Sequence, residues 1–189
     1  MSDMDKASKI CYGTLSLSPL QCSYSLQEKT SLLLYAFQKG INFFDTAELY
    51  DNYDILRELI RNINRKDIYI STKSYAYSKE TLDRSIDKAL TELNTDYIDI
   101  FMIHEQESIH TFRGHYAAIE RLQELKALGV VRNIGISTHF FQAVWDVGTQ
   151  KEVDIIHPIY NEKGIGIADG NIKQMAEAIK KTKSMGKKI

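Results

Sequence analysis

Cysteine, proline and any excess of one charge are scarce in this chain of 189 residues. The two cysteines, Cys11 and Cys22, have no histidine near them, so we predict neither a disulfide nor a metal site and expect a reduced, cytoplasmic compartment. A net charge of -1 gives no reason to expect nucleic acid or a membrane surface as a partner. No segment has the length and apolar character of a membrane span or a signal peptide.

The composition is that of a soluble globular domain. Hydrophobic residues make up 43% of the sequence and charged residues 26%, and the length is sufficient for one domain with a sizeable core. We predict a flexible tail over residues 1–8 and a single domain over residues 9–189. The basic run near the end, residues 180–188, is best explained as a solvated helix terminus, because lysine is favoured there by the helix dipole.

Short apolar runs alternate with amphipathic segments along the domain. Ser25 and Glu28 form a capping-box pattern, and Gly40 suits the end of the helix that follows. Residues 105–114 look irregular, and a helix is expected over 115–128. Strand–helix units of roughly 20–35 residues are typical of right-handed βαβ units in a parallel α/β sheet. Strands are expected at residues 9–17, 41–46, 68–73, 97–103, 131–137 and 153–157.

About six such units do not close a barrel of eight strands, so two strand edges would stay unpaired. The chain ends at Ile189, where a seventh strand is expected to begin. Open edges and exposed apolar surface drive association. We therefore expect the edge of the sixth strand to be exposed, and we expect self-association or a partner segment that covers that edge.

Polar residues stand at or just after the carboxyl ends of successive predicted strands. Asp45 and Tyr50 follow one apolar run, Lys73 ends the next, and His104 ends the one after. Each alone has an ordinary explanation, such as a helix cap, an exposed tyrosine, a solvated strand end or a histidine beside a loop. In a parallel barrel, however, these positions converge on one mouth, where such folds carry their chemistry.

This set of side chains suits proton transfer to a carbonyl oxygen. Tyrosine has a pKa near 10, and we expect the Lys73 ammonium to lower it by favouring the phenolate. Asp45 would hold Lys73 charged, and His104 would orient the substrate oxygen. The set matches a carbonyl reduction in which a cofactor supplies hydride and Tyr50 supplies the proton.

Four stretches of the chain, GINFFDTAELY, ISTKS, DYIDIFMIH and VVRNIGIS, resemble motifs of the aldo-keto reductase family, in order and at suitable spacing. The resemblance covers roughly residues 9–189. It implies a (β/α)8 TIM-barrel fold, here limited to about six βα units, with NADP(H) as cofactor, NAD(H) as the alternative, and a small-molecule carbonyl substrate. It assigns the catalytic positions to Asp45, Tyr50, Lys73 and His104.

The resemblance also implies cofactor contacts, with some departures from the family pattern. Ser137 would contact the nicotinamide amide, followed by Thr138 where asparagine is common. His157 stands where the family has glutamine, and Tyr160 would be the aromatic that stacks on nicotinamide. Asp51 follows Tyr50 where the family usually has glycine.

Family members are longer than this chain, and their last two units supply the loops that hold the cofactor phosphates. The length therefore suggests a fragment of a longer chain. HPIYNEKGIGI resembles a bacterial subgroup that often carries a ferredoxin-like iron-sulfur tail, but no cysteine cluster for one occurs here. Two alternatives to a working reductase stay open: a catalytically silent fragment, and a module that binds nicotinamide without turnover.

Overall fold

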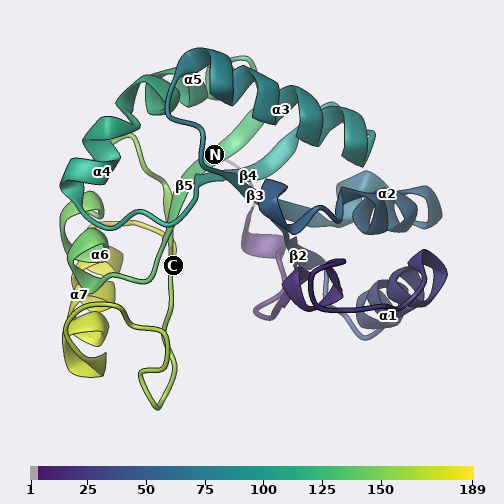
Figure 1. The fold of residues 1–189 in the computed structure, drawn as a ribbon, viewed down its shortest axis with the longest axis horizontal. Coiled ribbons are helices and arrows are strands. Elements are labelled where there is room, and N and C mark those ends of the chain that lie inside the picture. The colour runs from purple at the N-terminus through teal and green to yellow at the C-terminus, as the bar shows by residue number, and fades with distance from the viewer. Residues whose placement is uncertain (1–3) are drawn as a thin grey trace.

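The computed structural model describes residues 4–189 and contains one sheet of six parallel strands in chain order. The sheet curls into an open half-barrel whose convex side is covered by helices (Figure 1). This confirms the predicted fold class, six βα units of the (β/α)8 type. The strands are β1 (Cys11–Gly13), β2 (Phe43–Asp45), β3 (Tyr69–Ser74), β4 (Ile98–Ile103), β5 (Val131–Thr138) and β6 (Ile155–Pro158).

The helices begin and end largely where the local sequence signals place them. Ser25 and Glu28 form the expected capping box, and Gly40 adopts a φ of 90° after the first helix. None of the helices within residues 4–189 is long and apolar enough to cross a membrane. The α-helices are α1 (Leu26–Gln38), α2 (Tyr53–Asn62), α3 (Lys79–Leu93), α4 (Ile109–Gly114), α5 (Tyr116–Ala127), α6 (Phe141–Val147) and α7 (Ile172–Ser184). Short 3-10 helices are η1 (Met4–Lys6), η2 (Leu15–Leu17), η3 (Glu48–Tyr50) and η4 (Arg65–Asp67).

The main core lies between the convex face of the sheet and the helices. Leu33, Ile70 and Leu122 are fully buried members of it. The concave face carries a second, smaller apolar cluster of Ile100, Met102 and Ile155, with Phe43 and Met4 packed against it. Strand alternation explains the division, because successive side chains point to opposite faces of a sheet.

Two sequence-based expectations differ from the structure. Residues 105–114 are not irregular throughout, because Ser108 caps α4 by accepting hydrogen bonds from the backbone N–H groups of His110 and Thr111. Phe112 anchors this helix in the core. The first strand is also shorter than expected, since the chain turns into η2 soon after Gly13.

The flexible tail was predicted over residues 1–8, of which residues 1–3 lie outside the described part of the chain. Met4–Lys6 form η1. The Ser8 N–H donates to Asn42 Oδ1 at 2.6 Å, and the Asn42 N–H donates to Ser8 Oγ at 3.1 Å. Residues 4–8 thus contact the segment that leads into β2, and the domain boundaries stay a prediction.

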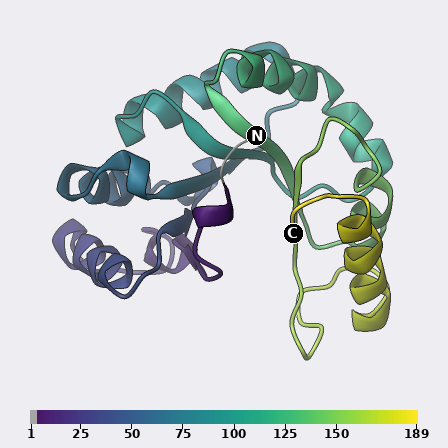
Figure 2. The same ribbon diagram turned by 180° about the vertical axis from the view of Figure 1, so that it is seen from behind.

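The C-terminal residues return to the sheet beside β6, as Figure 2 shows from behind. Lys188 forms a parallel bridge with Ile155. Its N–H donates to Asp154 O, and its carbonyl accepts from the Ile156 N–H, both at 3.0 Å. The edge of β6, which was expected to be open, is thus partly covered by one isolated bridge, and the sheet keeps six strands. At the other end of the sheet, β1 pairs with β2 on one side, and α1 exposes Leu32 and Tyr35, which are 41% and 60% accessible.

We predict that this chain self-associates through the β1–α1 end of the half-barrel, because that end combines a strand edge with exposed apolar side chains. Sedimentation velocity should show a concentration-dependent shift to larger species. The double substitution Leu32→Glu and Tyr35→Glu should weaken it. Leu128→Glu, at a 73% exposed position after α5, is the matched control and should leave it intact. A monodisperse monomer across the concentration range would contradict the prediction.

Candidate active site at the carboxyl ends of the strands

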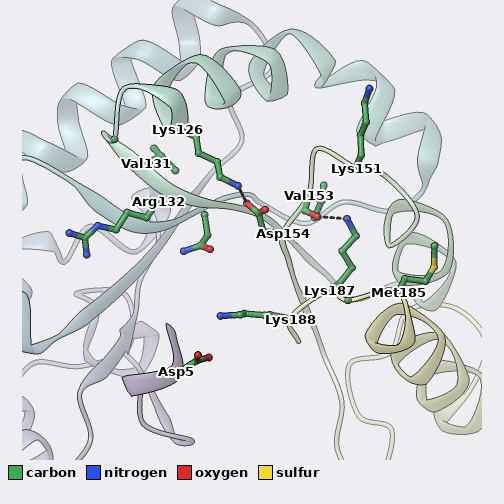
Figure 3. Close-up of a pocket in the computed structure, with 13 residues that line it drawn as sticks. Asp5, Lys126, Val131, Arg132, Lys151, Val153, Asp154, Met185, Lys187 and Lys188 are labelled. Atoms are coloured by element: carbon green, nitrogen blue, oxygen red, sulfur yellow. Dashed lines mark hydrogen bonds and ion pairs between the residues drawn. The ribbon is translucent and has the colours of Figure 1, made fainter. Parts of the chain in front are cut away.

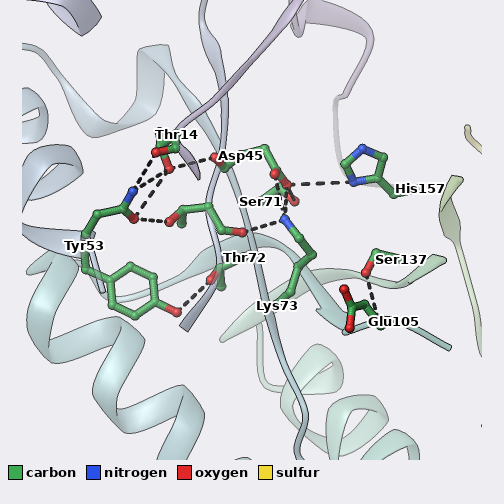
Figure 4. Close-up of polar contacts among 11 residues, drawn as sticks. Thr14, Asp45, Tyr53, Ser71, Thr72, Lys73, Glu105, Ser137 and His157 are labelled. Carbon is green, nitrogen blue, oxygen red and sulfur yellow. Dashed lines mark hydrogen bonds and ion pairs between the residues drawn. The ribbon is translucent and has the colours of Figure 1, made fainter. Parts of the chain in front are cut away.

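A buried ion pair joins the ends of β2 and β3. Lys73 Nζ lies 2.6 Å from Asp45 Oδ2 and 2.8 Å from Oδ1, and it also donates to Thr46 O at 2.7 Å. Ser71, two residues before Lys73 on the same face of β3, donates its hydroxyl to Asp45 Oδ1 at 2.9 Å (Figure 4). Both charges are buried and share multiple hydrogen bonds, the arrangement in which a buried pair is stable.

Tyr50 and His104 complete the predicted set at the same rim. Tyr50 is the last residue of η3. The Lys73 ammonium lies over the face of the Tyr50 ring, with Nζ 5.1 Å from the ring centroid. The His104 ring meets the Tyr50 ring edge-on at 6.0 Å between centroids. The structure thus brings Asp45, Tyr50, Lys73 and His104 to one rim, as predicted, and their catalytic roles stay a prediction.

The turn after Tyr50 explains how the chain tolerates a departure from the family pattern. Asp51, at the position where glycine was expected, has a φ of 49° in the left-handed region that favours glycine. The next residue, Asn52, is buried and fixes the turn. Its side chain donates to Thr14 O at 2.8 Å and accepts from the Thr46 hydroxyl at 2.7 Å.

The effect of Lys73 on Tyr50 was predicted wrongly. We expected the ammonium to lower the pKa of Tyr50, but burial raises this pKa to about 12, with the charges of Asp45 and Glu105 adding to the increase. The geometry gives the reason. Lys73 faces the ring of Tyr50, and its charge is matched by Asp45. Tyr50 therefore remains protonated at neutral pH.

His104 is held neutral. Its side chain is buried, and burial together with the nearby Lys73 lowers its pKa to about 4. The Tyr75 ring stacks on the imidazole at 4.7 Å between centroids. Nδ1 of His104 is buried without a hydrogen-bond partner among the described residues, so it is closed to a ligand in the hollow and only Nε2 is left for such a contact.

The predicted cofactor residues are only partly brought to this rim. Ser137 Oγ accepts from the Glu105 N–H at 3.1 Å, which leaves its own O–H free to donate. The Thr138 hydroxyl donates to Gln106 O and accepts from the Phe140 N–H, so it is satisfied locally.

The other two predicted cofactor residues differ in position. His157 lies opposite Ser137, with Nδ1 3.9 Å from Asp45 Oδ1 (Figure 4). Tyr160 is 53% exposed and does not line the hollow at the rim.

That hollow has a volume of about 150 Å³ and brings Tyr50, Lys73, His104, Glu105, Ser137 and His157 to one space. A larger hollow of about 870 Å³ lies at the amino ends of β5 and β6 (Figure 3). Its lining includes the Lys126–Asp154 ion pair and Lys187, which donates to Val153 O. None of the predicted catalytic residues lines this larger hollow, whereas Tyr50, Lys73 and His104 all line the smaller one.

Sequence reasoning missed three residues of the site, Ser71, Tyr75 and Glu105. Strand alternation around Lys73 could have found Ser71 and Tyr75, and Glu105 directly follows His104. Among residues 4–189, no group of three or more histidine, cysteine, aspartate or glutamate side chains is arranged to hold a metal ion.

Comparison with known proteins places this geometry in context. The sequence model of the family described as "Aldo/keto reductase family" matches residues 9–162 of this chain. The Bacillus subtilis protein named uncharacterized oxidoreductase YqkF is 34% identical over 155 residues, covering 72% of this chain and 46% of that protein. L-galactose dehydrogenase from Arabidopsis thaliana is 29% identical and covers 80% of this chain and 52% of that protein. The chain thus spans about half the length of these curated relatives.

Solved structures agree with the fold. A Pseudomonas aeruginosa structure with an aldo-keto reductase description superposes with a TM-score of 0.81 at 22% identity, covering 97% of this chain and 71% of that chain. The holo form of aldo-keto reductase AKR11C1 from Bacillus halodurans gives a TM-score of 0.71 at 25% identity, covering 82% and 54%. Aldo-keto reductase AKR2E4 from Bombyx mori, solved with NADP, gives a TM-score of 0.70 at 20% identity, covering 94% of this chain and 60% of that chain.

The lowered pKa of His104 makes stability depend on pH in a definite window. The unfolded chain binds a proton at His104 near pH 6.5, whereas the folded chain does so only near pH 4. Folding is therefore penalised progressively as pH falls from 6.5 to 4, by up to about 3 kcal/mol.

The free energy of unfolding, measured in urea at several pH values, should show this loss in the wild type and not in His104→Gln. His110→Gln, at an exposed position on α4, should retain it. Identical pH slopes for wild type and His104→Gln would contradict the buried, neutral state of His104.

Proposed function

Because the chain belongs to the aldo/keto reductase family, we propose that its rim site reduces a carbonyl to an alcohol, with hydride from NADP(H), or NAD(H) as the alternative, and Tyr50 as proton donor. One observation carries the proposal: the phenol of Tyr50 and the neutral imidazole of His104 meet at one hollow above the Asp45–Lys73 pair. A relative named methylglyoxal reductase DkgB from Salmonella typhi, 33% identical, supports a small carbonyl substrate.

Tyr50 is in the protonation state that donation requires. Its pKa of about 12 keeps the phenol O–H intact at neutral pH. An alkoxide is a stronger base than a phenolate, so the proton moves from Tyr50 to the substrate oxygen as negative charge develops there. A phenol with the ordinary pKa near 10 would also be protonated at neutral pH, so the raised pKa makes Tyr50 a weaker acid without changing its protonation state.

His104 supplies orientation. A neutral imidazole carries one N–H donor, and because Nδ1 is buried, the donor that can reach a ligand is Nε2–H. In the tautomer with the proton facing the hollow, that N–H donates to the substrate oxygen and holds it near the Tyr50 phenol. Its low pKa prevents His104 from competing with Tyr50 as the acid at neutral pH.

Lys73 and Asp45 act on Tyr50 indirectly. The Asp45 charge raises the pKa of Tyr50, and Lys73 balances that charge at 2.6 Å. Without Lys73 the carboxylate would face the phenol unpaired and oppose the build-up of phenolate as the proton leaves. Lys73 is therefore a positioning and electrostatic partner of the acid.

The residues of the rim fit the nicotinamide end of the cofactor. The Ser137 hydroxyl has a free O–H for a carboxamide oxygen, and His157 borders the same space. Thr138 lines the same hollow, but its O–H already donates to Gln106 O, so it can only accept a hydrogen bond from the cofactor. When bound, the cofactor supplies the hydride.

Cys11 and Cys22 are both free, which supports a reducing, cytoplasmic setting.

A module that binds nicotinamide without turnover is the second candidate. It is supported by the free O–H of Ser137 at the hollow, a contact that does not depend on the Tyr50 phenol. Such a module needs Ser137 and the hollow but not the Tyr50 phenol, so the two candidates separate by substitution.

Tyr50→Phe removes the phenol oxygen and keeps the ring. Carbonyl reduction with NADPH should fall by a factor of about 10²–10⁴, the usual contribution of a positioned acid. NADPH affinity should stay nearly unchanged. Tyr116→Phe, on α5 and not among the residues that line the hollow, is the matched control and should leave turnover intact.

Ser137→Ala should show the reverse pattern, with weaker NADPH binding and the acid in place. If Tyr50→Phe keeps full turnover, another group donates the proton and the assigned roles must be withdrawn. If the wild type binds NADPH saturably and turns over no carbonyl, the chain is the binding module.

A further inference from the structure

Glu105 places an unbalanced negative charge at the rim. Its side chain is exposed and lines the same hollow as Tyr50 and His104. Among the described residues Glu105 forms no ion pair, whereas the charge of Lys73 is matched by Asp45. Burial lowers the pKa of both His104 and His157, which disfavours a positive charge on either ring. A ligand entering the hollow therefore meets the Glu105 carboxylate as a net charge.

The backbone of Glu105 is strained in a way that keeps this carboxylate in place. Its φ of 52° lies in the left-handed region, which glycine would occupy without cost. The Glu105 N–H donates to Ser137 Oγ at 3.1 Å, and the next N–H, of Gln106, donates to Ser137 O at 2.8 Å. The end of β5 thus fixes the turn that presents the side chain, and strain of this kind clusters at functional sites.

A second contact fixes the carboxylate itself. Tyr75 donates its hydroxyl to Glu105 Oε2 at 2.5 Å, and the Tyr75 ring stacks on His104. The contact uses one carboxylate oxygen and leaves Oε1 with no hydrogen bond among the described residues. The charge acts on the site, because Glu105 contributes to raising the pKa of both Tyr50 and Tyr75.

We propose that Glu105 is a specificity-determining residue that favours carbonyl substrates carrying a positive charge and disfavours those carrying a carboxylate. The inference rests on the proposed function, because it takes the hollow beside Tyr50 as the place of the carbonyl. A cationic group gains a charge-assisted hydrogen bond or ion pair with Oε1, whereas a carboxylate meets a like charge in a partly desolvated site.

The test compares two aldehydes of the same shape, 4-(trimethylammonio)benzaldehyde and 4-carboxybenzaldehyde. With NADPH in excess, the wild type should show the higher kcat/KM for the cationic aldehyde. In Glu105→Gln, which keeps the Tyr75 contact and removes the charge, the cation-to-anion ratio should fall by at least about tenfold. Glu107→Gln, an exposed position two residues on, is the control and should keep the wild-type ratio.

A binding measurement makes the test independent of turnover. The corresponding benzyl alcohols are titrated into the chain while the His104 ring signals are followed by NMR, and the ratio of Kd values should change in the same way in Glu105→Gln. Glu105→Gly, which relaxes the backbone and also removes the charge, should agree with Glu105→Gln.

The outcomes separate the two proposals. A shifted Kd ratio without turnover supports charge selection and contradicts the reductase. Turnover that depends on Tyr50 with an unchanged ratio supports the reductase and overturns charge selection. Failure of both alcohols to bind near His104, or a wild-type preference for the carboxylate, also overturns it.

Discussion

The buried ion pair between Asp45 and Lys73 is the interaction on which the site depends. It joins the ends of β2 and β3, and it places one cation and one anion within 3 Å of each other at a point with little access to water. Such a pair is stable only while both charges keep their partners. Ser71 and the Thr46 carbonyl supply the additional hydrogen bonds, so the surrounding turn and strand are fixed together with the pair.

The pair also affects the protonation of the two neighbouring rings, Tyr50 and His104. Because Lys73 is balanced by Asp45, burial dominates at Tyr50, whose phenol stays protonated. His104 stays neutral because burial lowers its pKa, and the Lys73 ammonium adds to that decrease. The rim thus presents two uncharged donors and one unmatched charge, that of Glu105. An acid that keeps its proton until alkoxide forms, beside a donor that does not ionise, is what reduction of a carbonyl needs.

Two strained residues hold these donors in place. Asp51 follows Tyr50 and Glu105 follows His104, and both adopt left-handed backbone conformations. In each case a buried polar network fixes the turn, through Asn52 in one and through Ser137 in the other. The positions of the acid and of the orienting imidazole are therefore determined by the residues next to them in the chain, and not only by the strands that precede them.

The strand ends and the convergence of the four catalytic candidates could be predicted from sequence, because strand periodicity and parallel order place those residues on one edge. The direction of the shift in the Tyr50 pKa could not be predicted. It depends on whether the Lys73 ammonium lies over the Tyr50 ring or beside its hydroxyl, and on how deeply Tyr50 is buried. The local use of the Thr138 hydroxyl and the Tyr75–Glu105 contact depend on loop conformations that no periodicity encodes. The helix α4 was missed because its signal is a single cap and one anchoring phenylalanine.

A double-mutant cycle on the ion pair tests the central claim most directly. The free energy of unfolding is measured for wild type, Asp45→Asn, Lys73→Met and the double variant. Each single change should cost about 3–5 kcal/mol, because it leaves one buried charge without its partner, and the double variant should recover much of that loss. If the double variant loses the sum of the two single changes, the charges are not coupled, and the account of how the rim is organised is wrong.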